Sequence, residues 1–295
     1  MNAALCLVDV FTQQALRGNP VAVVIADATP PDATMLALAA WTGMPETVFA
    51  TPGDAEADYR VRIWSPRREL PFAGHPSIGT AHALLATGRV APHAARPGRL
   101  VQASPFGQVT MRVDEGAHGR IWFRTPQAAV TMLEAPATHE VNAALGIVPA
   151  GDIAAVSAAC VEAGARWLVV RGEQPDLLDR LAPDLPAIEA LSARHRVSGI
   201  TVVAPARKAQ RDIAVRSFGP AIGVNEDAAC GGGNACAAAL IAALREWHEG
   251  GANAVAMQGG HVGRDATLYW RGPDRERRLE IGGHAVLVSQ GTLQL

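Results

Sequence analysis

Short runs of apolar and β-branched residues alternate along the chain with two kinds of helical pattern. The runs have the length and composition of β-strands. Apolar positions at helical spacing predict one amphipathic helix that begins at Pro31-Asp32 and another over 183–195. The predicted strands are Leu5–Phe11, Val21–Ile25, Thr47–Ala50, Tyr59–Trp64, Val109–Val113, Ile121–Arg124, Trp167–Val170, Thr201–Val203, Ile213–Phe218, Ala254–Gln258, Ala266–Trp270 and Ala285–Ser289.

Two further helices, over 74–86 and 231–247, are rich in alanine and apolar on almost every face. A helix that is apolar all round is buried, and its small residues let strands pack close to its backbone. The pattern therefore predicts an α/β (α+β) protein in which a sheet or barrel surrounds a central helix, twice over. The polar segments 114–119 and 135–152 are the predicted linkers.

The two halves of the chain resemble each other. DYRVRIWSP at 58–66 matches DIAVRSFGP at 212–220, with Asp, Val, Arg and Pro at the same offset. Further on, a glutamine and a glycine fall in step again at 102–108 and 258–264. Matching segments in the same order predict a duplicated fold of about 150 residues per half.

Titratable groups near the turns of this repeat are present in one half only. Structural residues of a repeat are expected in both halves, as Arg62 and Arg216 are. The polar residues that occur once therefore predict a single site, shared between the halves, to which each half contributes a part. The unmatched pairs are Glu46 with Ile200, His75 with Gly232, Asp227 with Leu70, and Cys230 with Ala73.

Glycines open both alanine-rich helices, at Gly74 and at 231–233. They leave backbone N–H groups bare at two helix N-termini, which together with the helix dipole favours an anion. Two such turns can hold a substrate carboxylate and, opposite it, a developing enolate oxygen. A carboxylate such as Glu46 in this cleft suits a residue that both takes and returns a proton.

Each candidate also has a purely structural interpretation. Glu46 can be interpreted as a solvent-exposed helix cap before a strand, and Asp227 as the cap of the second glycine-rich helix. His75 can be interpreted as a polar side chain that fills space in a turn before proline, and Ser77 as an N-cap residue. Cys230 at a helix N-terminus has a lowered pKa if it is exposed, whereas a buried cysteine is a small hydrophobe.

Composition narrows the function further. The 26 basic and 28 acidic residues give a net charge of −2. This balance excludes binding to nucleic acid or to an anionic membrane surface that is driven by the overall charge of the protein. No apolar run approaches the roughly 18 residues that span a bilayer, and the start, MNAALCLVDVFTQQ, lacks the basic region of a secretory signal. The four cysteines form no CxxC pair, so reduced thiols in a cytoplasm are expected. No dinucleotide fingerprint, P-loop or metal-ligand spacing occurs, so no cofactor and no metal is predicted.

Several segments together resemble one known family. DVFT, GNPVAVV, ETVF, GHPSIGTAHAL, EDAACGGGNA and the closing IGGHAVLVSQGTLQL are similar, in order, to segments of the PhzF phenazine-biosynthesis-like family. The resemblance implies a diaminopimelate-epimerase-like fold of two pseudo-symmetric halves, each a mostly antiparallel barrel-like sheet around a central helix. The halves would be 1–128 and 129–284, with the last strand, about 285–295, returning to the first. The family resemblance also implies a homodimer that uses no cofactor or metal.

The same resemblance implies an activity. Members of this family are isomerases that move a proton between carbons of a small cyclic amino acid, so a small carboxylate is the expected partner. The family's catalytic glutamate falls on Glu46, and the histidine and aspartate that line its cleft fall on His75 and Asp227. The residues expected to bind the substrate are Gly74, Gly231, Gly232, Cys230 and Ser77.

One segment departs from the family pattern. Where the family reads EDPATGSAN this chain reads EDAACGGGN, so Ala228, Cys230 and Gly232 replace proline, threonine and serine. The missing serine hydroxyl removes a substrate hydrogen bond, so the resemblance leaves the substrate open. Cys230 resembles the second catalytic cysteine of related epimerases and racemases, whose first cysteine is Ala73 here. The alternatives are therefore a Cys230-assisted racemase, epimerase or lyase, and a non-catalytic protein that binds small carboxylates.

Overall fold

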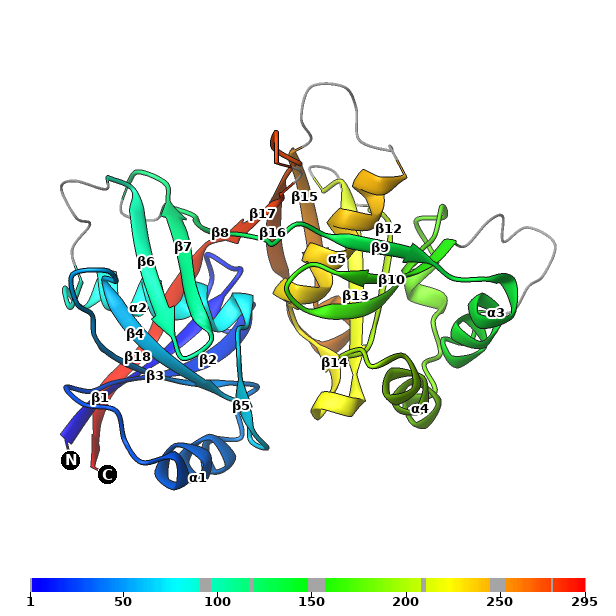
Figure 1. The fold of residues 1–295 in the computed structure, drawn as a ribbon. Helices are drawn as coiled ribbons and strands as arrows, with labels where there is room; N and C mark the ends of the chain where they lie inside the picture. The colour runs from blue at the N-terminus through cyan, green and yellow to red at the C-terminus, as the bar shows by residue number, and fades with distance from the viewer. Residues whose placement is uncertain are drawn as a thin grey trace. The chain divides into compact units, whose positions relative to one another are not determined.

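The computed structural model divides into two compact units that the chain connects twice. Unit 1 comprises Met1–Arg124 and Gly282–Leu295, and unit 2 comprises Thr125–Ile281. Both are mixed α/β units dominated by strands (Figure 1). The structure describes residues 2–90, 97–116, 119–147, 157–207, 211–244, 253–276 and 278–294.

Unit 1 is a mostly antiparallel sheet. Strand β1 pairs antiparallel with both β18 and β2, and the sheet continues through β3, β4, β6, β7 and β8. Only the β2–β3 and β4–β6 pairs are parallel among these strands. The strands are β1 (Asn2–Val10), β2 (Asn19–Ile25), β3 (Thr47–Pro52), β4 (Tyr59–Trp64), β5 (Glu69–Leu70), β6 (Arg99–Ser104), β7 (Gly107–Val113), β8 (Ile121–Arg124) and β18 (Ala285–Gln294).

Helix α2 (Gly74–Ala86) is the buried centre of unit 1. It contacts β1, β2, β3, β8 and β18, and its small residues make this close packing possible. A Cβ atom at Gly79 would lie 2.5 Å from the Val21 side chain. Helix α1 (Asp32–Thr42) lies outside the sheet, where Met35 and Leu38 pack against a cluster that includes Phe49.

Unit 2 repeats the order of strand pairings. Its β10–β11, β12–β13 and β15–β16 pairs are antiparallel, and its β11–β12 and β13–β15 pairs are parallel. The corresponding pairs of unit 1 follow the same sequence of directions, which confirms the predicted duplication. The strands are β9 (Ala129–Met132), β10 (Ser157–Glu162), β11 (Arg166–Arg171), β12 (Ile200–Pro205), β13 (Ile213–Gly219), β14 (Val224–Asp227), β15 (Asn253–Gln258) and β16 (Ala266–Arg271), and β17 (Glu280–Gly283) runs from this unit into unit 1.

Helix α5 (Gly231–Ala243) takes the central place in unit 2 that α2 takes in unit 1. It contacts β9, β10, β11, β12 and β16, and its residues from Asn234 to Leu240 are all buried. Both central helices contain 13 residues and begin at a glycine. The predicted fold class is therefore confirmed. The other helical segments are α3 (Ala135–Ala144), α4 (Leu185–His195), η1 (Leu178–Arg180), η2 (Pro220–Ile222) and η3 (Gly260–Val262).

Two sequence-based expectations need correction. The segment 135–152, predicted as a linker, contains helix α3, which buries Val141 and Ala144 in the core of unit 2; residues 148–152 lie outside the described part of the chain. The segment 114–119 is the turn between β7 and β8 inside unit 1, and its residues 117–118 lie outside the described part. No helix among the described residues is long and apolar enough to cross a membrane.

Candidate active site

Glu46 and His75 meet in unit 1. Glu46 lies directly before β3, and His75 is the second residue of α2. Their side chains are largely buried, and Nε2 of His75 lies 3.3 Å from Oε2 of Glu46. The structure thus brings together two of the three residues predicted to be catalytic.

Burial keeps His75 neutral. Loss of solvent lowers the pKa of the imidazole to about 4, and a contact with the Pro20 carbonyl opposes this shift only in part. Nε2 lies 3.4 Å from that carbonyl oxygen, which can only accept a hydrogen bond. Nε2 therefore carries the proton and faces both the carbonyl and the Glu46 carboxylate. His75 is a hydrogen-bond donor at neutral pH, with Nδ1 left as an acceptor.

The turn before α2 depends on glycine. A Cβ atom at Gly74 would lie 2.6 Å from the Phe123 ring, so a side chain here would displace the aromatic packing. The N-cap residue is Ala73, which offers no side-chain hydrogen bond. The first N–H groups of α2 therefore lack a partner from the helix or its cap.

Ser77 does not cap α2, which corrects one structural interpretation. It lies four residues after the N-cap, is fully buried, and accepts a hydrogen bond of 3.0 Å from Nε2 of Gln102. Its contact with a substrate stays a prediction.

Asp227 and Cys230 lie in one turn of unit 2. Oδ1 of Asp227 accepts a 3.0 Å hydrogen bond from the N–H of Ala229, which closes the turn after β14. The cap of α5 is Cys230, whose Sγ accepts from the N–H of Gly233 at 3.2 Å. The expectation that Asp227 caps this helix is therefore wrong.

Cys230 is buried, so its thiol is not activated. Only 7% of the residue is exposed. Burial raises its pKa well above the ordinary value, and the neighbouring Asp227 raises it further, while the Gly233 N–H lowers it to a smaller extent. The thiol is protonated at neutral pH, contrary to the lowered pKa expected for an exposed cysteine at a helix N-terminus.

Gln258 holds this turn in place, a role that sequence analysis did not assign. Its Oε1 accepts from the N–H of Cys230 at 3.2 Å and from Nδ2 of Asn234 at 2.8 Å, and its Nε2 donates to the Asp227 carbonyl at 2.9 Å. Trp270 in turn donates to Oδ1 of Asn234 at 3.0 Å. The sequence feature that indicated this role was the glutamine that recurs at the same place in both halves.

An arginine braces the neighbouring strand in each unit. Arg216 makes a bidentate pair with Glu226, at 2.9 and 2.8 Å, and donates to the Leu178 carbonyl. Arg62 makes the same pair with Glu69. These residues recur because they are structural, as the sequence comparison indicated.

The register of the strands corrects one alignment. The N–H of Ala22 donates to the Glu46 carbonyl at 3.3 Å, and the N–H of Leu168 donates to the Gly199 carbonyl at 3.0 Å. Ala22 pairs with Thr47 as Leu168 pairs with Ile200. The counterpart of Glu46 is therefore Gly199 and not Ile200. Gly232 remains the counterpart of His75, since each is the second residue of its helix.

The predicted site residues fall into two groups, one in each unit. Glu46, His75, Gly74 and Ser77 belong to unit 1, and the remaining four belong to unit 2. In the described part of the chain, no three His, Cys, Asp or Glu side chains gather as a metal ion would require.

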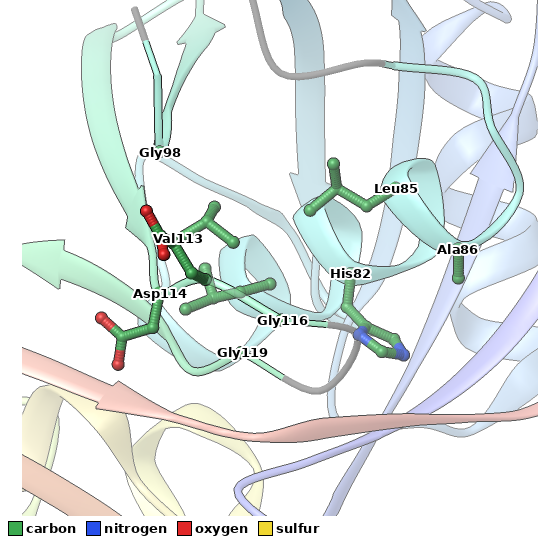
Figure 2. A pocket seen from close by; sticks show the side chains of 10 residues that line it. His82, Leu85, Ala86, Gly98, Val113, Asp114, Gly116 and Gly119 are labelled. Carbon is green, nitrogen blue, oxygen red and sulfur yellow. The ribbon is translucent and has the colours of Figure 1, made fainter.

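A cavity of about 370 Å³ also lies in unit 1, but none of the predicted residues lines it (Figure 2). Its walls come from the end of α2 and the β7–β8 turn. The lining residues are His82, Leu85, Ala86, Gly98, Val113, Asp114, Glu115, Gly116, Gly119 and Ile121.

Solved structures of other proteins share this architecture. A Bacillus anthracis protein of the PhzF family superposes with a TM-score of 0.87 at 20% identity, and the match covers 100% of both chains. A hydroxyproline epimerase from Agrobacterium vitis superposes with a TM-score of 0.65 at 14% identity, covering 99% of this chain and 91% of that one. These likenesses establish the fold.

Sequence comparison gives the family. The chain belongs to the family described as phenazine biosynthesis-like protein (PhzC-PhzF), which matches residues 8–291. It is 34% identical over 230 residues to antisense-enhancing sequence 1 of Schizosaccharomyces pombe, covering 77% of this chain and 76% of that protein. It is 31% identical over 293 residues to trans-2,3-dihydro-3-hydroxyanthranilate isomerase of Pseudomonas fluorescens, covering 98% of each. With such relatives along its length, the chain is an isomerase.

Proposed function

We propose that this isomerase moves a proton between carbons of a small cyclic amino or hydroxy acid, with Glu46 as the general acid and base. The observation that carries the proposal is the 3.3 Å contact between the Glu46 carboxylate and a buried histidine that stays neutral. A neutral imidazole beside the carboxylate does not neutralise it as a cation would, which suits a residue that must accept a proton.

The proton balance of the reaction is closed. Glu46 takes a proton from one carbon of the substrate, which leaves an enolate-like anion, and returns the proton to another carbon. No electrons are gained or lost, so the step needs no oxidant or reductant. His75 orients Glu46 and relays protons, and the N–H groups at the glycine turns stabilise the carboxylate and the developing charge.

Unit 2 contributes Asp227 and the turn at Gly231 and Gly232. Asp227 is anchored by the Ala229 N–H and lies beside a glutamine-braced turn, so its position is well defined for a substrate amino or hydroxyl group. The proposal also includes a cytoplasmic homodimer that uses no cofactor or metal.

The experiment is proton NMR in D2O with a panel of cyclic and linear amino and hydroxy acids, including 2,3-dihydro-3-hydroxyanthranilate. Deuterium incorporation at a substrate carbon by the wild-type protein is the expected result. No incorporation with any compound, combined with measurable carboxylate binding, would instead identify a non-catalytic binding protein.

The Cys230→Ser variant separates acid–base isomerisation from the cysteine-assisted alternative in the same assay. Serine keeps a side-chain acceptor for the N–H of Gly233, so the helix cap is preserved. Incorporation within a few-fold of wild type is expected because the thiol is protonated and buried. Complete loss would assign the chemistry to Cys230.

A further inference from the structure

Unit 2 carries two glycines at the positions where unit 1 carries Glu46 and His75. Gly199 is the counterpart of Glu46, and Gly232 is the counterpart of His75. The side chains of the acid–histidine pair are thus absent from the second half. Another side chain lies next to these two glycines.

The indole of Trp167 lies beside the Cβ positions of both glycines. A Cβ atom built on Gly199 would lie 2.8 Å from Cζ3 of Trp167, and one built on Gly232 would lie 3.4 Å from its Nε1. The ring therefore spans both Cβ positions, and its N–H lies beside the first turn of α5. A Cβ atom at Gly199 would also lie 2.0 Å from the Phe218 carbonyl oxygen, so the adjacent backbone as well as the ring requires glycine here.

The indole N–H of Trp167 has no acceptor among the residues that the structure describes. Trp167 is 2% exposed, yet no hydrogen bond from Nε1 to any residue in the described ranges exists in the structure. Nε1 of Trp167 is not among the fully buried side-chain atoms that lack a partner, so an acceptor from outside the chain can reach its N–H. The neighbouring Trp270, in the same unit, has an acceptor within the chain in Asn234.

Further donors converge on the same place. The cap of α5 satisfies the N–H of Gly233, and helix geometry leaves the N–H groups of Gly231 and Gly232 without a partner inside the helix. Trp167 adds a side-chain donor at Gly232. Two backbone N–H groups, an indole N–H and a helix N-terminus together fit an anionic acceptor with two oxygens.

We propose that Trp167 is a substrate-binding residue, whose indole N–H donates a hydrogen bond to a carboxylate oxygen held at the N-terminus of α5. Gly199 and Gly232 make room for it, and this donor is what unit 2 contributes in place of an acid–histidine pair. The inference rests on the proposed function for the class of ligand. It deepens that function by naming a specificity residue that faces the carboxylate.

The test is titration of the protein, labelled with ¹⁵N in its tryptophan indoles, with acetate, L-proline and anthranilate. Trp167→Phe removes the N–H, keeps an aromatic ring and assigns the Trp167 signal. We expect that signal to move downfield and saturate with at least one of the three carboxylates. The signals of Trp270, whose N–H is already bonded, and of the exposed Trp41 serve as matched controls in the same spectrum.

Two variants measure the consequence for binding. Trp167→Phe is expected to weaken the affinity for the carboxylate about tenfold, as loss of one hydrogen bond to a charged group implies. Gly232→Ala places a methyl group beside the indole N–H and is expected to abolish the chemical-shift change while the Trp167 signal remains. This second variant keeps the test decisive if Trp167→Phe does not fold.

The outcomes separate this inference from the proposed function. A Trp167 signal that does not move with any of the three carboxylates would overturn the inference, even if proton exchange through Glu46 is intact. Glu46→Gln is expected to keep the shift, because Glu46 supplies proton transfer and not this hydrogen bond. Absence of proton exchange in the wild type with a moving Trp167 signal would instead reject only the proposed chemistry.

Discussion

Nε2 of His75 lies 3.3 Å from Oε2 of Glu46, and the same nitrogen lies 3.4 Å from the carbonyl of Pro20. Because a carbonyl cannot donate, this geometry fixes the proton on Nε2. The histidine is therefore neutral and lies beside the carboxylate, and it is not the cation of an ion pair. A Glu46 carboxylate beside a neutral imidazole has the capacity to accept a proton from a substrate carbon.

The first prediction concerns the pH dependence of stability. An unfolded histidine takes up its proton near pH 6.5, whereas His75 in the folded protein does so only near pH 4. Between these values the unfolded state binds one more proton, so stability is lost as the pH falls. We expect wild type to lose about 2 kcal/mol of unfolding free energy between pH 7 and pH 5 from this residue.

Urea denaturation of His75→Gln measures this contribution. The variant cannot be protonated at this position, so its stability should fall less than that of wild type over the same pH range. His139→Gln, at an exposed position, is the matched control and should follow wild type. Identical pH dependence in His75→Gln and wild type would contradict a neutral buried histidine.

A second prediction compares the two arginine braces. Arg216→Met leaves the largely buried carboxylate of Glu226 without its cation, which costs about 3–5 kcal/mol of unfolding free energy. Arg62→Met should cost less because the Arg62–Glu69 pair is more exposed. Replacing both Arg216 and Glu226 by apolar residues should recover part of the loss. Equal costs for the two arginine variants in denaturant titrations would show that burial does not set the energies.

The third prediction concerns the glutamines that recur in both halves. Gln258→Leu leaves two buried donors and one carbonyl around Asp227 unsatisfied, with an expected cost of about 3 kcal/mol. Gln102→Leu removes one hydrogen bond to Ser77, and Oε1 of Gln102 has no partner among the described residues, so about 1 kcal/mol is expected. Thermal and denaturant unfolding of the two variants would refute this difference if Gln102→Leu were the more damaging one.

A fourth prediction concerns thiol reactivity. Cys230 is buried and its raised pKa keeps the thiol protonated, whereas Cys160 is partly exposed. Iodoacetamide at pH 7.5 should therefore label Cys160 faster than Cys230, as peptide mass mapping over time would show. Faster labelling of Cys230, together with its protection by substrate, would favour the cysteine-assisted chemistry.

Sequence patterns predicted the duplicated fold because each half repeats its strands, its arginine brace and its glycine-rich helix. They also singled out Glu46 and His75, since titratable groups found in only one half of a repeat stand out. The counterpart of Glu46 was misplaced by one residue. Alignment of the letters TVFA with TVVA places Glu46 opposite Ile200, whereas the strand pairing in the two units makes Thr47 the counterpart of Ile200.

Two features could not be predicted from the sequence, for physical reasons. Helix α3 has a short, weakly amphipathic pattern that begins with Ala-Pro, and its helical state depends on the burial of Val141 in unit 2. Trp167 lies in a strand-like run in which any apolar residue fits equally well. Only the positions of Gly199 and Gly232 around the ring distinguish it from ordinary core.

The central claim, that Glu46 carries the proton, is tested most directly by deuterium incorporation in D2O with Glu46→Gln beside wild type. Glutamine has nearly the same shape and can lie beside His75 as the glutamate does, but it cannot take a proton. We expect deuterium at a substrate carbon with wild type and a rate lower by about 10²–10⁴-fold with the variant, at unchanged thermal stability. Incorporation at the wild-type rate in Glu46→Gln would contradict the account.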